Sequence, residues 1–273
     1  MRPSLILRRG LAFPGGKFQP GFDPTHVAAS GISSGNGISV ISLGGTKMIN
    51  LLNGQGPNTY TADSGNILSV LGPSTYFNTQ GNTFTGQASN GLTGITYAAI
   101  VQFTAVAGAY QTIIQCSSNI FGLNADTTVA FYLASGEASS GITPVANTPY
   151  FIAASVYNNA ANSAICAFLV MNLRTGKIQT ASVTSTNNLI ASANGTVAVG
   201  NNGNIQFTQG YMAAAMYAPA VVSLSAMLQW AADPWGFWYP SNFIDEVSGI
   251  GILVRGPSAA PAGVISTGMI VYP

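Results

Sequence analysis

The chain has 273 residues, 47% of them hydrophobic, and only eight basic and seven acidic side chains, for a formal net charge of +1. An ordinary soluble domain is about a quarter charged, so little electrostatic repulsion keeps copies of this chain apart. The near-zero charge argues against a nucleic-acid partner, which requires clustered Lys and Arg, and the many apolar residues argue against disorder.

Residues 1–35 are rich in proline and glycine, which exclude a long helix or a regular strand. We therefore expect an extended N-terminal arm over residues 1–35. Its basic side chains are candidates for docking into an assembly: Arg2, Arg8, Arg9 and Lys17. The apolar run at the start is too short for an export signal, and no apolar run approaches the roughly 18 residues of a membrane span.

Short apolar runs separated by Gly, Asn, Ser and Thr follow from residue 36 to residue 240. Gly44-Gly45 and Asn53-Gly54 are dipeptides that suit tight hairpin turns. This spacing is typical of an all-β sandwich or barrel. The predicted strands lie near 38–43, 48–52, 75–77, 95–103, 110–115, 128–133, 150–157, 164–173, 177–184, 195–199 and 210–217.

One helix is predicted after these strands, with Ser223 as its N-cap. The apolar side chains expected on its buried face recur at i, i+3 and i+4: Leu224, Met227 and Leu228. Asp233-Pro234 ends the helix, and Trp230 is expected to pack beneath the aromatic side chains that follow at 235–239. Residues 241–273 are again rich in Gly, Pro and Ala, which predicts a C-terminal tail with short strands.

The two cysteines, Cys116 and Cys166, both lie in apolar, strand-like runs. Two cysteines cannot form a disulfide framework. Buried free thiols are the first interpretation, and one disulfide between neighbouring strands is the alternative.

Six segments carry strand patterns in a fixed order, at 97–103, 111–115, 149–157, 167–176, 196–201 and 207–217. In that order they resemble the laminin-G-like, concanavalin A-like lectin/glucanase jelly roll. The resemblance implies an all-β, concanavalin A-like jelly-roll β-sandwich over residues 36–240, with the arm and the tail outside it.

The aromatic ending at 233–240, Asp-Pro-Trp-Gly-Phe-Trp-Tyr-Pro, is similar to phage and prophage versions of this domain, as is the lead-in at 21–29 and 49–54. This resemblance implies a structural virion protein of a tailed phage or phage-like particle: a head decoration, head fibre or tail-associated subunit. Its partners would be other capsid or tail proteins and further copies of itself, in a trimer or larger homo-oligomer. Its location would be the virion.

A module that binds a host surface polysaccharide is the alternative function, because aromatic rings and amides bind sugars without net charge. The candidate residues are Trp235, Trp238, Tyr239, Tyr157, Asn158, Asn159, Asn201 and Asn202. Tyr110 and Tyr132 lie in or beside predicted loops and share this interpretation. The competing interpretation is that the aromatic ending caps the core and that the asparagines form turns.

Glycoside hydrolysis ranks third, because it needs two carboxylates facing one cleft. The chain has two glutamates, Glu137 and Glu246, and no two acidic residues stand two or four apart on a strand-like run. Asp245 and Glu246 would point to opposite faces of a strand. The one histidine, His26, lies in the predicted arm. We therefore expect that the chain is not an enzyme.

No metal or cofactor is predicted, since zinc requires several His or Cys ligands. Calcium is the alternative, because it binds carboxylate and carbonyl oxygens. Its candidate ligand is Asp126, beside Asn124 at a strand-to-loop junction.

Overall fold

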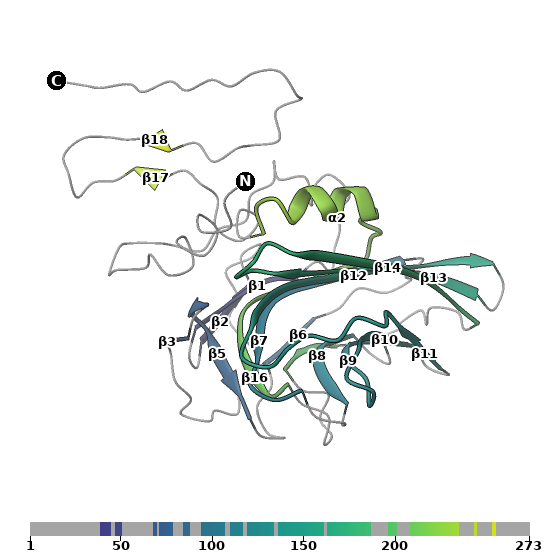
Figure 1. Cartoon of the computed structure of the whole chain (residues 1–273), viewed down its shortest axis with the longest axis horizontal. Coiled ribbons are helices and arrows are strands. Elements are labelled where there is room, and N and C mark those ends of the chain that lie inside the picture. Colours follow the sequence, from purple (N-terminus) through teal and green to yellow (C-terminus); the bar gives the residue numbers. More distant parts are fainter. Residues whose placement is uncertain are drawn as a thin grey trace.

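The computed structural model describes residues 39–44, 47–50, 68–69, 71–78, 84–87, 94–106, 110–116, 119–133, 136–160, 163–186, 196–200, 208–234, 243–244 and 253–254. Within these ranges strands dominate, and they form two large antiparallel sheets that face each other (Figure 1). The predicted all-β sandwich is confirmed, whereas jelly-roll connectivity stays a prediction. The arm, with Arg2, Arg8, Arg9 and Lys17, lies outside the described residues, and the proposed domain boundaries also stay predictions.

The larger sheet has eight strands. In spatial order they are β14 (Ile178–Ser185), β13 (Ser163–Asn172), β12 (Pro149–Ala160), β7 (Gly94–Phe103), β16 (Gly210–Ala218), β1 (Ser39–Gly44) and β2 (Lys47–Asn50), with β5 (Thr75–Phe77) also paired to β16. Strands β1 and β2 pair antiparallel, with Gly44 opposite Lys47, and the predicted Gly44-Gly45 turn extends outside the described residues.

The smaller sheet has six strands. In order they are β11 (Gly136–Ser139), β10 (Val129–Leu133), β9 (Asn119–Leu123), β8 (Gln111–Cys116), β15 (Thr196–Val199) and β6 (Phe84–Gln87). Two short hairpins pair separately: β3 (Leu68–Ser69) with β4 (Gly72–Pro73), and β17 (Phe243–Ile244) with β18 (Leu253–Val254). Strands β6, β9 and β11 are absent from the sequence prediction.

Strand β7 is buried along its whole length, because both faces of its sheet are covered. Its inward side chains include Tyr97, whose ring packs beside Phe121 and Phe131 of the opposite sheet. Its outward side chains, Ala98 and Ile100, belong to a second apolar cluster on the far side of the sheet. A strand covered on both faces reads as a continuous apolar run, which explains the sequence at 97–101.

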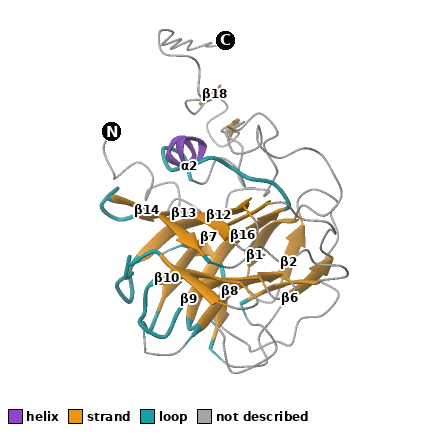
Figure 2. Cartoon of the chain, turned by 90° about the vertical axis from the view of Figure 1, so that its right-hand side faces the viewer, coloured by secondary structure: helices purple, strands orange, loops and turns teal. Residues whose placement is uncertain are grey.

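Helix α2 (Leu224–Trp230) forms the outer layer over the eight-stranded sheet (Figure 2). Ser223 caps it as predicted, its hydroxyl oxygen accepting a hydrogen bond from the Ala226 N–H at 3.2 Å. Met227 and Trp230 are buried, whereas Leu228 is 42% exposed. The prediction that Leu228 faces the sheet is therefore wrong, because the i, i+3, i+4 spacing of buried residues begins at Met227 and continues to Trp230 and Ala231.

The segment that leads into α2 is fixed by one buried hydroxyl. Thr96 Oγ1 donates to the Ala220 carbonyl oxygen at 2.7 Å and accepts from the Val222 N–H at 2.9 Å. Its oxygen also lies 3.0 Å from Ser155 Oγ on the neighbouring strand. This network ties the helix layer to β7 and β12. Within the described ranges, no helix has the length and apolar character needed to cross a bilayer.

Cys116 and Cys166 are both buried free thiols, as first interpreted. They lie on β8 and β13, which belong to different sheets, so the alternative of a disulfide between neighbouring strands is wrong. Burial raises the pKa of the Cys166 thiol to about 12 and also raises the pKa of Cys116.

The buried thiols, together with the buried phenol of Tyr97, predict that the folded protein loses stability at alkaline pH. Burial also raises the pKa of Tyr97, so the folded state holds protons that the unfolded chain releases. Unfolded thiols ionise near pH 8.5 and phenols near pH 10. The free energy of unfolding should therefore be constant at neutral pH and fall above about pH 8.5, by up to about 1.4 kcal/mol per pH unit for each group. Urea unfolding from pH 7 to 11 measures this slope, and Cys166→Ala should reduce it; an unchanged slope in that variant contradicts the assignment.

Candidate functional site

A row of four side chains crosses the outer face of the six-stranded sheet. Strand register places Gln115, Ile120, Tyr132 and Glu137 side by side on β8, β9, β10 and β11. The residues adjacent to them in sequence point the other way, into the core between the sheets: Cys116, Phe121, Phe131 and Ala138. The row therefore faces away from the core, and Glu137 at its end is exposed.

Tyr110, just before β8, packs edge-on against Tyr132, with ring centroids 5.1 Å apart and ring planes at 73°. Its side chain is 39% exposed. Gly122 allows the close backbone approach beside this pair, because a Cβ at that position would collide with the carbonyl oxygen of Gln111. A register shift between Thr112 and Ile114 accompanies this approach. The bulge and the glycine thus set where the chain enters β8 with Tyr110.

The Glu137 carboxylate is positioned by a buried amide. Asn124 Nδ2 donates to Glu137 Oε1 at 2.9 Å. The Asn124 side chain is itself fixed, since its Oδ1 accepts from the N–H groups of Asp126 and Thr128, both at 3.1 Å. Glu137 also stands directly opposite Tyr132 in the strand register. A carboxylate of fixed orientation therefore lies beside the tyrosine pair.

The Asp126 carboxylate stabilises the loop in which it lies. Its Oδ1 accepts from the Thr128 N–H at 2.9 Å and from Thr128 Oγ1 at 2.6 Å, and these hydrogen bonds lower the pKa of the Asp126 carboxyl. In the described part of the chain, no three His, Cys, Asp or Glu residues gather as metal ligands. The cofactor prediction, including the calcium alternative at Asp126, stays a prediction.

The Tyr132 hydroxyl is buried and has no hydrogen-bond partner among the described residues. Burial raises its pKa, and the negative charge of Glu137 and the neighbouring Tyr110 and Asp126 raise it further. The phenol therefore remains a protonated donor. A buried donor left without a partner costs about 1–3 kcal/mol, and ordered water is the usual partner of such a group in folded proteins.

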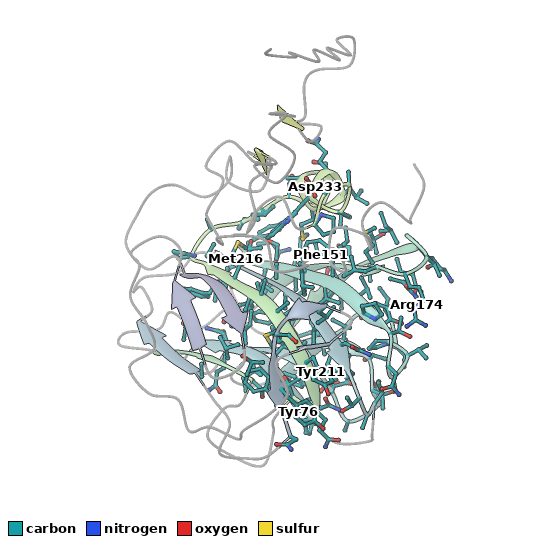
Figure 3. The ribbon with its side chains drawn as sticks, turned by 90° about the vertical axis from the view of Figure 1, so that its left-hand side faces the viewer. Tyr76, Phe151, Arg174, Tyr211, Met216 and Asp233 are labelled. Atoms are coloured by element: carbon teal, nitrogen blue, oxygen red, sulfur yellow. The ribbon has the colours of Figure 1, made fainter. Side chains whose placement is uncertain are left out.

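A second tyrosine pair lies on the eight-stranded sheet, where the rings of Tyr76 and Tyr211 are side by side (Figure 3) with centroids 4.7 Å apart. The strand register sets Gln102 opposite Tyr211. This pair therefore has an amide, and no carboxylate, as its cross-strand neighbour.

Among the glycan-binding residues predicted from the sequence, three have described positions on the other sheet. Tyr157, Asn158 and Asn159 lie exposed near the end of β12, on the eight-stranded sheet. Five others lie outside the described residues: Trp235, Trp238, Tyr239, Asn201 and Asn202. Tyr110 and Tyr132 were recognised as candidates, but Glu137 was noted only as an acid without a partner. Tyr132 and Glu137 are five positions apart, and they become opposite neighbours only through the β10–β11 hairpin, whose second strand the sequence does not predict.

No family model matches the sequence, and no curated protein matches it in sequence. Among solved structures, Trypanosoma rangeli sialidase in complex with the inhibitor DANA has a TM-score of 0.48 and 10% identity over 71% of this chain. Domain 4 of AbnA, a GH43 extracellular arabinanase from Geobacillus stearothermophilus, in complex with arabinotriose, has a TM-score of 0.42 and 13% identity; the match covers 73% of this chain and 91% of that one. An arabinofuranosidase complexed with arabinofuranosyl-alpha-1,2-xylobiose has a TM-score of 0.44 and 14% identity, covering 80% of this chain and 45% of that one.

This chain spans 32% of the sialidase's length. The three structures named above come from glycosidases and not from virion proteins. This finding contradicts both the predicted virion function and the expectation that the chain is not an enzyme. Both predictions are corrected here. The predicted virion location depended on that function and stays untested. With TM-scores below 0.5, the likeness assigns no activity or substrate to this chain.

Proposed function

We propose that this protein binds carbohydrate through Tyr110, Tyr132 and Glu137 on the outer face of its six-stranded sheet. The observation that carries the proposal is the edge-on tyrosine pair beside a carboxylate held in place by Asn124. Aromatic rings with a few positioned polar groups are the usual composition of a small-molecule site.

Each of the three side chains has a distinct task in this proposal. The exposed ring of Tyr110 offers an apolar surface to the C–H face of a sugar ring. Glu137 accepts hydrogen bonds from sugar hydroxyls, and a charged acceptor makes such bonds roughly twice as strong as neutral ones. The Tyr132 ring packs edge-on against Tyr110 and fixes the orientation of that exposed ring.

The proposal predicts measurable binding to at least one neutral polysaccharide. Titration calorimetry against soluble arabinan, xylan, galactan and β-glucan tests it, and release of reducing sugar from the same samples shows whether binding is accompanied by hydrolysis. Tyr110→Ala should weaken binding about tenfold or more, because truncating an aromatic anchor typically costs at least 1–2 kcal/mol.

Tyr157→Ala is the matched control, since Tyr157 is 37% exposed, close to the 39% of Tyr110, and lies on the other sheet. Its affinity should stay within about twofold of the wild type, as expected for a residue away from the contact. Failure of the wild type to bind any of the four polymers contradicts the proposal. So does an equal loss in Tyr157→Ala, or a loss in Tyr76→Ala without one in Tyr110→Ala, which would move binding to the other sheet.

A further inference from the structure

We propose that the Tyr110–Tyr132 site selects glycans without acidic groups and rejects those that carry carboxylates, with Glu137 as the residue that discriminates. This inference deepens the proposed function and rests on it. It concerns the class of ligand: uncharged polysaccharides, as opposed to uronic-acid or sialic-acid polymers.

The charges around the site have one sign. Among the described residues, the groups that act electrostatically on the Tyr132 hydroxyl are Glu137, Tyr110 and Asp126, and none is a cation. The two cations whose side chains are described, Arg174 and Lys177, lie in the turn between β13 and β14 of the other sheet. The Arg174 guanidinium reaches the Asn147 carbonyl oxygen at 3.5 Å.

A ligand that binds on the tyrosine pair lies close to the negative charge of Glu137. The carboxylate is opposite Tyr132 in the register, where cross-strand Cβ atoms lie about 4.5–5.5 Å apart. The hydrogen bond from Asn124 Nδ2 restrains it from turning away. Sugar hydroxyls donate to this carboxylate, whereas a ligand carboxylate has no proton to donate and meets a like charge.

The size of the discrimination follows from Coulomb's law. Two unit charges about 4 Å apart repel enough in bulk water to weaken binding about fivefold, and the factor grows where the ligand excludes water. Salt screens this repulsion at exposed sites. The discrimination should therefore be largest at low ionic strength.

The experiment compares one polymer in two forms: the panel member that binds best, native and with part of its hydroxyl groups carboxymethylated. At about 20 mM salt the wild type should bind the carboxymethylated form about fivefold more weakly or worse, and the ratio of the two affinities should narrow at about 500 mM. Glu137→Gln removes the charge but keeps an oxygen for Asn124 Nδ2. In this variant native-polymer binding should weaken, because a neutral amide oxygen is a weaker acceptor than a carboxylate. The ratio of the two affinities should shrink to about twofold.

Asp233→Asn is the charge-matched control, because Asp233 follows α2 on the other side of the sandwich. It makes the same change in net charge, and it should leave the ratio of the affinities for the two polymer forms as large as in the wild type. Equal wild-type affinity for the two forms overturns the inference, as does an equal narrowing in Asp233→Asn, and in both cases the proposed function stands. Absence of binding to any native polymer overturns the proposed function and the selectivity together.

Discussion

Replacing Tyr97 with alanine is expected to lower the free energy of unfolding by about 3–5 kcal/mol, the usual cost of removing a large buried aromatic side chain. Tyr97 is fully buried on β7. Its ring lies 6.0 Å from Phe121, 5.6 Å from Phe131 and 5.5 Å from Tyr217, measured between centroids. These partners belong to both sheets, so the cavity would open between the two layers. Urea unfolding followed by circular dichroism measures the change.

Tyr97→Phe separates the ring from its hydroxyl. The Tyr97 hydroxyl donates to the Asn119 carbonyl oxygen at 3.0 Å. The substitution removes this donor from the carbonyl oxygen. The loss should be about 1–3 kcal/mol, the cost of one unmade buried hydrogen bond. If Tyr97→Ala costs no more than Tyr97→Phe, the ring does not hold the sheets together.

Replacing Trp230 with alanine is expected to cost about 3–5 kcal/mol as well, but in a different layer. Trp230 is fully buried between α2 and the eight-stranded sheet, with its ring centroid 5.0 Å from that of Phe151. The helix has only seven residues, far fewer than the about 12–15 that an isolated helix needs to be even marginally stable in water. Its amides should therefore lose hydrogen-exchange protection before those of β7.

Leu228→Ala is the control within the same helix, because Leu228 is 42% exposed. Its effect should stay within about 0.5 kcal/mol, as for most surface substitutions. Equal losses of protection in α2 and β7 of Trp230→Ala would show that the helix and the sheet unfold as one unit, contrary to this expectation.

Strands with strong apolar periodicity could be predicted from the sequence, and those without it could not. Thr75–Phe77 is observed with the predicted bounds, and β7 differs from its prediction by one residue. Strands β9 and β11 were missed, because Asn-Ile-Phe-Gly-Leu and Gly-Glu-Ala-Ser contain turn-forming and polar residues. Sheet pairing stabilises these two strands despite their weak local preference.

The candidate site was hidden for the same reason. The tyrosines at 110 and 132 are 22 residues apart, and their contact requires β8, β9 and β10 to lie in one sheet. Glu137 enters the site only through the β10–β11 register and the Asn124 hydrogen bond. Chain spacing alone does not reveal a row of side chains that runs across four strands.

The predicted homo-oligomer and the predicted lack of a nucleic-acid partner stay predictions.

The position of α2 has a practical consequence for attaching the protein to a sensor surface. The helix covers one outer face of the sandwich, and the tyrosine site occupies the opposite one. Both native thiols are buried, so a Leu228→Cys variant would give a maleimide linker one accessible sulfur on the described part of the chain. Immobilised there, the molecules would share a single orientation, with the carbohydrate face turned toward the flowing analyte.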